Sequence, residues 1–330
     1  MKPVVLVSRA VFPDVVDRLR AHFDVEDNPA DRVFTKAELI QRLAGKQGVF
    51  ATGSERFDAE VLDANPQLKA ICNMAVGYNN IDVDACSARG VLCTNTPDVL
   101  TETTADFGFA LMMATARRIA ESEHFLRRGE WKKWSYEMFA GSDVHGATLG
   151  ILGMGRIGQG IAKRGAHGFG MKVIYHNRSR LAPGIEAECR ASYVSKEALL
   201  RDADHLVIVV PYSPASHHAI GAAELAQMKR TATLTNIARG GVVDDGALAQ
   251  ALAERRIAAA GLDVFEGEPA LNPALLTVPN VVLTPHIASA TIATRRAMAN
   301  LAADNLIAAL GFGPNAGRPP TPINAAVLKG

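Results

Sequence analysis

The chain has 330 residues, a length that suits two domains with a hydrophobic core in each. Its 35 basic and 34 acidic residues almost cancel, so neither a nucleic-acid partner nor an anionic membrane surface is expected. Hydrophobic residues make up 48% of the chain, which is ordinary for a globular protein, and no apolar run approaches membrane-spanning length.

The first hundred residues alternate short apolar runs with helical segments. The strand candidates are Val4–Val7, Gly48–Ala51, Leu68–Cys72 and Val91–Thr94. They predict a small doubly wound parallel sheet with helices on both faces. The apolar run at the N-terminus is too short for a signal peptide, so we expect a cytoplasmic protein. Asn95-Thr96-Pro97 ends this pattern, and a long helix is expected from about Thr101 to Leu126.

A Gly-x-Gly-x-x-Gly motif at residues 153–158 lies near the middle of the chain, between a strand-like run and a helix-like segment from Ile157 to Phe169. This order is typical of a dinucleotide-binding fold. Gly153 would permit the tight turn, Gly155 the close approach of a pyrophosphate, and Gly158 the packing of the helix on the strand. The pyrophosphate is expected to bind N–H groups at the helix N-terminus, around Arg156 and Ile157.

Five further strand candidates follow the motif: Lys172–His176, His205–Val210, Thr231–Ile237, Ala259–Val264 and Val281–Thr284. With the strand before the motif they make six, the number in a full Rossmann sheet. A last helix from about Ala290 to Leu310 has no strand after it, and is expected to return to the first domain.

The chain is therefore predicted to be an α/β protein with two doubly wound parallel-sheet domains. Residues 1–99 and 291–330 would form a smaller flavodoxin-like substrate domain, into which a Rossmann domain of residues 100–290 is inserted. The substrate cleft is expected between them.

Arg239, Glu268 and His286 each lie just beyond a predicted strand of the second half. Because ligands of open α/β sheets bind beyond the carboxyl ends of the strands, the three are expected to share one site. Arg239 can bind a carboxylate through two hydrogen bonds, and His286 can transfer a proton to or from a carbonyl oxygen. Glu268 would orient the histidine and favour its protonated form.

Five segments together resemble the D-isomer-specific 2-hydroxyacid dehydrogenase family, in the family's order and over almost the whole chain. They are 95–97, 153–158, 236–240, 261–269 and 284–290. The resemblance implies that Arg239 binds the substrate, that Glu268 is the glutamate partner and that His286 is the acid/base. It also implies a homodimer with a dimerisation arm at about 120–146. Residues 98–103 and 143–146 look most like those of the bacterial glyoxylate, hydroxypyruvate and 2-ketogluconate reductases.

The family's substrate loop is represented by residues 74–82, where the resemblance implies that the N–H groups of Val76 and Gly77 hold the substrate carboxylate beside Arg239. Asn79 stands where the family more often has Asp. Trp134 lies in the expected arm. In related reductases a tryptophan of this arm reaches the partner's substrate pocket, and simple packing at the dimer interface is the alternative.

The residues after the Lys172–His176 strand favour NADPH as the cofactor. NAD-specific Rossmann folds place an acidic residue about 20 positions past the glycines, but Asn177 stands there. Arg178, Ser179 and Arg180 follow, and would attract a 2′-phosphate that a carboxylate would repel. NADH is the weaker alternative.

The resemblance implies further cofactor contacts. Val210 and Pro211 are expected beside the adenosine half and Ser216 near the phosphates. The remaining contacts are expected at Ile237, Ala238, Asp263, His286 and Ala288, of which the first three border the nicotinamide.

Other signals are interpreted as structural. The four cysteines show no metal-site spacing and are expected to be reduced and buried. The adjacent His217 and His218 are assigned to a surface loop because neighbouring histidines do not readily chelate one ion and no acidic partner is expected nearby. No metal site is predicted.

The predicted activity is the NADPH-dependent reduction of glyoxylate, hydroxypyruvate or 2-ketogluconate to a D-2-hydroxy acid. The alternatives are 3-phosphoglycerate, formate or phosphite dehydrogenase, and a non-catalytic nucleotide-sensing protein of the same fold.

Overall fold

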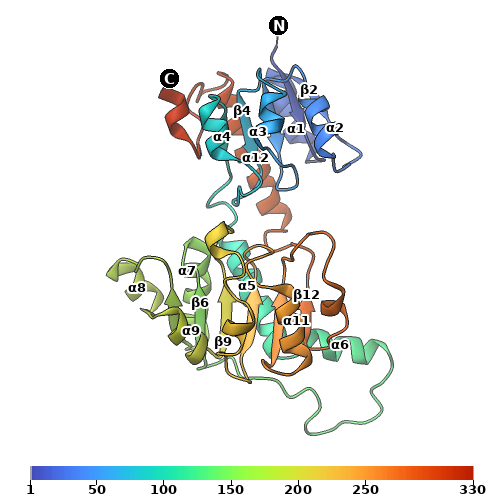
Figure 1. The fold of residues 1–330 in the computed structure, drawn as a ribbon, viewed down its shortest axis with the longest axis vertical. Helices are drawn as coiled ribbons and strands as arrows, with labels where there is room; N and C mark the ends of the chain where they lie inside the picture. Colours follow the sequence, from blue (N-terminus) through green and yellow to red (C-terminus); the bar gives the residue numbers. More distant parts are fainter. Residues whose placement is uncertain (1, 330) are drawn as a thin grey trace. The chain divides into compact units, whose positions relative to one another are not determined.

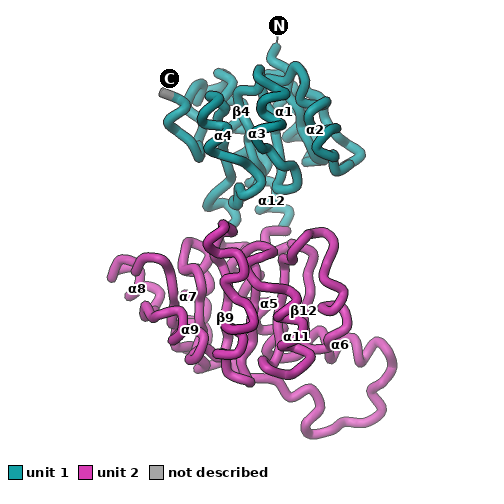
Figure 2. The backbone as a smooth tube through the Cα atoms, in the orientation of Figure 1, with its two compact units in different colours: residues 1–100, 291–330 teal, residues 101–290 magenta. Residues whose placement is uncertain are grey.

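The computed structural model describes residues 2–329, which divide into two compact units (Figure 2). Unit 1 combines the segment up to Leu100 with the segment from Thr291 onward, and unit 2 comprises Thr101–Ala290. Each unit is an open, parallel α/β sheet, so the predicted fold class is confirmed.

Unit 1 contains a five-stranded sheet with the order β2-β1-β3-β4-β5 (Figure 1). This is the order of flavodoxin-like sheets. Its strands are β1 (Val4–Val7), β2 (Asp24–Asp27), β3 (Gly48–Ala51), β4 (Ala70–Asn73) and β5 (Leu92–Thr94). Its helices are α1 (Pro13–His22), α2 (Lys36–Leu43), α3 (Ala59–Asp63), α4 (Val83–Ala88) and α12 (Ile292–Ala309).

The strands of unit 1 send alternate side chains into two separate cores, as the pleat of a strand dictates. Leu6, Val49 and Ile71 pack with residues of α2, α3 and α4. Val5 and Phe50 pack with residues of α1 and α12. The alanines of α12 bring this helix close to the sheet, where it lies against β3 and β4.

Unit 2 contains a seven-stranded parallel sheet with the order β12-β11-β10-β9-β6-β7-β8. This is the Rossmann order with one added strand, β12, and β6 and β9 meet at its switch point. Its strands are β6 (Thr148–Leu152), β7 (Lys172–His176), β8 (Ala191–Tyr193), β9 (His205–Ile208), β10 (Thr233–Asn236), β11 (Ala259–Leu262) and β12 (Val281–Leu283). Its helices are α5 (Thr101–Ala116), α6 (Ile119–Arg127), α7 (Arg156–Lys163), α8 (Pro183–Cys189), α9 (Lys196–Asp202), α10 (Ala222–Leu225) and α11 (Asp245–Ala253).

Two predicted helices differ from the observed ones. The long helix expected over residues 101–126 is broken, because α5 ends at Ala116 and Arg118 has a left-handed backbone with φ +53°. The Ala116 carbonyl accepts a hydrogen bond from Ser142 N (2.9 Å), so it is not used to continue the helix. The helix expected over residues 157–169 is α-helical only to Lys163, and Arg164–Gly168 form a π-helical turn.

The loop between α6 and β6 extends away from the sheet of unit 2 (Figure 1). Among residues 2–329 no helix is both long enough and apolar enough to cross a membrane. All four cysteines are free and buried.

Candidate active site

The glycine motif forms a tight turn between β6 and α7. Gly153 has φ +100°, and a Cβ there would lie 2.7 Å from Val210 N. A Cβ at Gly158 would overlap the carbonyl oxygen of Gly153, so α7 starts directly against the end of the strand. Apart from its chain neighbours, no described residue has an atom within 4 Å of a Cβ built at Gly155, and α7 begins at Arg156 without a side-chain cap. This helix start therefore leaves room for an anion at its N-terminus, as pyrophosphate binding requires.

The segment after β7 carries the residues predicted to distinguish the two nicotinamide cofactors. Asn177 Oδ1 accepts a hydrogen bond from Met154 N (2.6 Å), which ties this segment to the glycine turn. Arg178 and Ser179 are exposed, and Arg178 pairs with no carboxylate of residues 2–329. Arg180 instead makes a two-bond ion pair with Glu186 (2.9 and 2.8 Å). Of the two arginines, Arg178 is thus the more available to a ligand.

The segment after β9 carries Val210, Pro211 and Ser216. Val210 contacts the glycine turn through its backbone, as the Gly153 geometry shows. The Ser216 hydroxyl donates to Pro211 O (2.9 Å) and accepts a hydrogen bond from Ser213 N (2.8 Å). It therefore stabilises its own loop, and its contact with the phosphates stays a prediction.

Glu268 and His286 follow the adjacent strands β11 and β12, and their side chains form a hydrogen bond. Glu268 Oε2 lies 2.9 Å from His286 Nδ1, and Glu268 Oε1 accepts a second hydrogen bond from Phe265 N (2.8 Å). Because a carboxylate can only accept, Nδ1 carries the proton and Nε2 is left to gain or lose one. The His286 side chain is 47% exposed, so a ligand can reach it.

The charges around Glu268 keep it ionised. Burial by itself raises the pKa of Glu268, but the hydrogen bonds from His286 and Phe265 N, with the charges of His286 and Arg239, hold that pKa below its usual range. Glu268 therefore remains a carboxylate that can hold an imidazolium, which suits the orienting role predicted for it.

Arg239 lies on the segment after β10, and its Nη1 donates to Ala238 O (2.7 Å). Burial lowers the pKa of its guanidinium, while the Glu268 carboxylate acts to raise it. A Cβ at Gly240 would overlap the carbonyl group of Phe265, so this segment packs directly against the one that carries Glu268. Ile237 and Ala238, predicted to border the nicotinamide, are both buried.

Asp263 holds the loop that carries His286. Its Oδ1 accepts hydrogen bonds from Thr284 Oγ1 (2.7 Å) and Ile287 N (2.8 Å), and its Oδ2 accepts one from Ala288 N (2.9 Å). These bonds clamp the loop around His286, whose backbone is left-handed with φ +54°. Burial raises the pKa of Asp263, and the three hydrogen bonds oppose that effect. The sequence predicts Asp263 only as a cofactor contact, although a buried carboxylate at the end of an apolar strand signals a partner such as this loop.

In unit 1, two asparagine side chains fix the loop with Val76 and Gly77 by hydrogen bonds to its carbonyl groups. Asn95 Nδ2 donates to Val76 O (2.8 Å), and Asn73 Nδ2 donates to Gly77 O (3.0 Å). The N–H groups of Val76 and Gly77 donate to no acceptor among residues 2–329. Half-buried N–H groups without an acceptor favour an anionic ligand.

The expectation that His217 and His218 lack an acidic neighbour is wrong. Glu266 Oε1 accepts a hydrogen bond from His218 Nε2 (2.7 Å), and ligand atoms of all three side chains lie within 4.8 Å of one another. The reason is tertiary: Glu266 belongs to the segment after β11, far along the chain. The two imidazole rings are stacked, with centroids 3.9 Å apart and planes at 22°. The observed contact is the His218–Glu266 pair.

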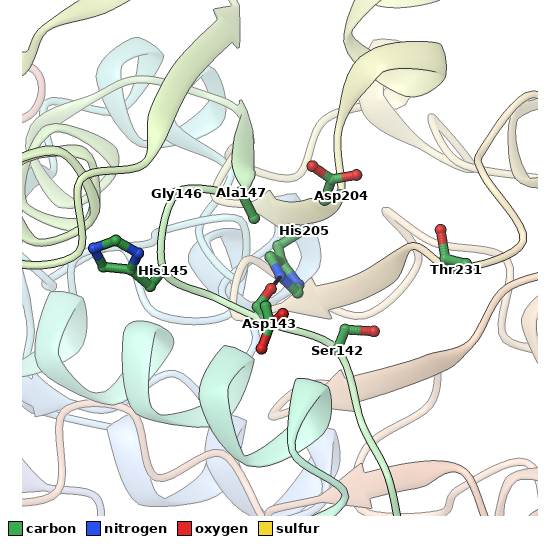
Figure 3. Close-up of a pocket in the computed structure, with 8 residues that line it drawn as sticks. All are labelled: Ser142, Asp143, His145, Gly146, Ala147, Asp204, His205 and Thr231. Carbon is green, nitrogen blue, oxygen red and sulfur yellow. Dashed lines mark hydrogen bonds between the residues drawn. The ribbon is translucent and has the colours of Figure 1, made fainter.

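A hollow of about 360 Å³ lies at the other end of the same sheet (Figure 3). It is lined by Asp143, His145, Asp204, His205 and Thr231 among others, which precede or begin strands. The buried His205, which lines the hollow, forms hydrogen bonds with Thr233 Oγ1 (2.8 Å) and Asp143 O (3.0 Å). Because it lies at the amino ends of the strands, the hollow is not part of the candidate site.

Trp134 lies on the extended loop after α6 and is 71% exposed. Trp131 and Tyr136 on the same loop are also exposed, and no residue of α6 is buried. Large exposed aromatic side chains are typical of a surface that binds a partner.

Comparisons with known proteins identify the family. The model of the D-isomer specific 2-hydroxyacid dehydrogenase NAD-binding domain matches residues 109–288. The glyoxylate reductase of Thermococcus gammatolerans is 47% identical over 333 residues, which cover 100% of this chain and 98% of that protein.

Solved structures give the same result over the whole fold. The TT0316 protein of Thermus thermophilus has a TM-score of 0.87 and 42% identity, and the match covers 97% of this chain and 99% of that one. The NADPH-dependent glyoxylate/hydroxypyruvate reductase of Sinorhizobium meliloti, in complex with NADP and malonate, has a TM-score of 0.85 and 35% identity over 98% of this chain and 97% of that one. The chain therefore belongs to the D-isomer-specific 2-hydroxyacid dehydrogenases and is an NAD(P)H-dependent enzyme of that family.

Proposed function

We propose that this enzyme is an NADPH-preferring reductase that converts glyoxylate and hydroxypyruvate, and also 2-ketogluconate, to D-2-hydroxy acids. The observation that carries the proposal is the Glu268–His286 pair, with Nδ1 held by a carboxylate and Nε2 open. The names of the Thermococcus and Sinorhizobium relatives support the substrate class.

The residues present suit a nicotinamide dinucleotide. The open space at Gly155 and the uncapped start of α7 would accept its pyrophosphate, and the segment after β10 would border its nicotinamide. When bound, the reduced cofactor supplies the hydride that is added to C2 of the oxo acid.

The chain supplies binding and proton transfer. Arg239 is assigned to the substrate carboxylate, as are the N–H groups of Val76 and Gly77, because both features offer hydrogen-bond donors to an anion. His286 donates the Nε2 proton to the carbonyl oxygen as negative charge develops on it. Glu268 stabilises the imidazolium before this step and keeps the ring oriented, while Asp263 holds the loop.

The preference for NADPH rests on Asn177 and Arg178. Asn177 places an amide where a carboxylate would bind the ribose of NADH, and Arg178 is exposed beside it. We assign the main contacts with the 2′-phosphate to Arg178 and Ser179. Arg180 is assigned a smaller contribution, because its guanidinium is already paired with Glu186.

We also infer that the enzyme is a homodimer joined through the loop after α6, because this loop exposes Trp131, Trp134 and Tyr136. Light scattering of the wild type and of a Trp131→Ser/Trp134→Ser variant tests this inference. A monomeric wild type would contradict it.

One absorbance assay tests the main proposal. NADPH and NADH are each combined with glyoxylate, hydroxypyruvate, 2-ketogluconate, pyruvate and phosphohydroxypyruvate. Highest kcat/KM is expected with NADPH and one of the first three acids. Dominant activity with NADH would contradict the cofactor assignment, and activity only on phosphohydroxypyruvate would contradict the substrate class.

A further inference from the structure

A second histidine–glutamate pair lies two residues from Glu268. Glu266 Oε1 accepts a hydrogen bond from His218 Nε2 at 2.7 Å, and both side chains are about one third exposed (37% and 35%). The proposed reaction has no use for this pair, yet it belongs to the segment that carries the partner of His286.

Glu266 is also bound to the start of α11. Its N–H donates to Asp245 Oδ2 (3.0 Å), and its Oε2 accepts from Asp245 N (3.4 Å). Asp245 is only 2% exposed, so its carboxylate cannot move away into solvent. The segment after β11 is therefore fixed at Glu266 from two sides, by His218 and by Asp245.

These contacts continue to Glu268 through one residue, Phe265. Phe265 N, which donates to Glu268 Oε1, immediately precedes Glu266 in the chain. On the other side, His218 N donates to Gly241 O (2.7 Å), next to the glycine that packs on Phe265. A displacement of Glu266 would therefore move the peptide that orients the Glu268 carboxylate.

We propose that His218, Glu266 and Asp245 are positioning residues that set the orientation of Glu268 toward His286. None of them is assigned a contact with substrate or cofactor; they act through the backbone at Phe265 and Glu266. This inference rests on the proposed role of the Glu268–His286 pair.

The charges around His218 support the arrangement. The Glu266 hydrogen bond raises the pKa of His218, burial opposes this, and the charges of Glu266, Asp244 and Asp245 raise it further. Asp244 Oδ2 lies 3.8 Å from His218 Nδ1, and the ring of His217, which is hydrogen-bonded to Tyr212, stacks on that of His218. The protonated form of His218 is thus favoured by the carboxylates of Glu266, Asp244 and Asp245, and its hydrogen bond keeps Glu266 in place.

The test compares His218→Ala with His217→Ala. His217 is its exposed neighbour, and it forms a hydrogen bond with Tyr212 (3.3 Å) and none with Glu266. We expect His218→Ala to lower kcat by about tenfold, which is less than the effect of a 1 Å misplacement of a reacting group. NADPH affinity, measured by fluorescence titration, should stay within about twofold, and His217→Ala should stay within about twofold in every parameter.

Three further variants separate positioning from loss of stability. His218→Gln keeps an N–H donor, so it should recover part of the lost kcat. Glu266→Gln and the double variant His218→Ala/Glu266→Gln should have similar kcat values, because both break the same chain of contacts.

Equal kcat values for His218→Ala and His217→Ala would overturn the proposal, as would additive effects in the double variant or a loss confined to NADPH affinity. Failure of the proposed function looks different, because then His286→Ala would retain turnover. If His286→Ala is inactive and His218→Ala matches the wild type, only the positioning role is wrong.

Discussion

The two units hold their candidate ligand loops with different chemistry. In unit 1 the carbonyl groups of Val76 and Gly77 are held by the neutral amides of Asn95 and Asn73. In unit 2 the loop of His286 and its partner are held by the carboxylates of Asp263 and Glu268. A loop that offers N–H groups to an anion is best held by neutral groups, whereas an imidazole that must keep a proton is best held by anions.

The largest effect is expected in unit 2, where carboxylates hold the ligand loop, for the His286→Ala variant. Without the imidazole, kcat should fall by about 10²–10⁴-fold, because the proton donor is lost. NADPH binding, followed by fluorescence, should remain. Near-normal turnover of the variant would mean that another group transfers the proton.

Arg239→Ala should come next. We expect kcat/KM for glyoxylate to fall by about 10²-fold, because a half-buried charged donor to the carboxylate is lost. The KM for NADPH should change little, and Arg239→Lys should recover only part of the loss because it cannot make two parallel bonds. If the KM for the oxo acid were unchanged in Arg239→Ala, groups other than Arg239 would bind the carboxylate and the assignment would be wrong.

The cofactor preference is a smaller effect within the same unit. Arg178→Ala should reduce the ratio of kcat/KM for NADPH over NADH by about tenfold, as expected for one hydrogen bond to a charged group. Arg180→Ala should change the ratio less, because Arg180 is paired with Glu186. If the two variants behave alike, the distinction drawn from the ion pair is wrong.

In unit 1, where neutral amides hold the ligand loop, the tests are made at Asn73 and Asn95. Either alanine variant should raise the KM for glyoxylate by about fivefold, the value of one hydrogen bond, with a smaller change in kcat. Asn79→Ala on the same loop is the control, because the Asn79 side chain is exposed and forms no hydrogen bond within residues 2–329. Asn95→Asp should be worse than Asn95→Ala, since it places an anion near the anion-binding N–H groups. The reverse order would contradict the contrast between the units.

The last test concerns stability and pH. Burial raises the pKa of Asp245 to about 6, above its ordinary value of 3.8, so the native state binds this proton more tightly than the unfolded state. The stabilisation from this group is full below its ordinary pKa and is lost as the pH rises through the native value. Between pH 4 and 6 the free energy of unfolding of Asp245→Asn should therefore rise relative to that of the wild type, by about 1.4 kcal/mol per pH unit.

Urea unfolding at several pH values measures the difference between Asp245→Asn and the wild type. A difference that does not change with pH would show that Asp245 does not titrate in this window. The control change Asn73→Ala should give a pH-independent difference, because an amide does not titrate there.

The strands that could be predicted are those with strong local signals. Val4–Val7 and the strand before the glycines consist mainly of buried apolar residues, and the structure has both. The strands that were missed, β2 and β8, lie at sheet edges. β2 contains Asp24, Glu26 and Asp27, and β8 has only three residues, so neither shows the apolar pattern of a central strand.

The residues of the candidate site were found because Arg239, Glu268 and His286 each follow a strand, and parallel strands bring such positions to one edge. Their roles stay proposals. Their supports were not found, because a hydrogen bond between Asp263 and Ile287, or between His218 and Glu266, joins segments that are distant in the chain.

Local patterns were thus enough for the two parallel sheets, the glycine turn and the positions of the polar residues, since each depends on a short run of neighbouring residues. Long-range contacts decided the break between α5 and α6 and the acidic partner of His218. Each of these depends on which distant group meets a side chain or carbonyl once the strands have packed, and no local pattern records that.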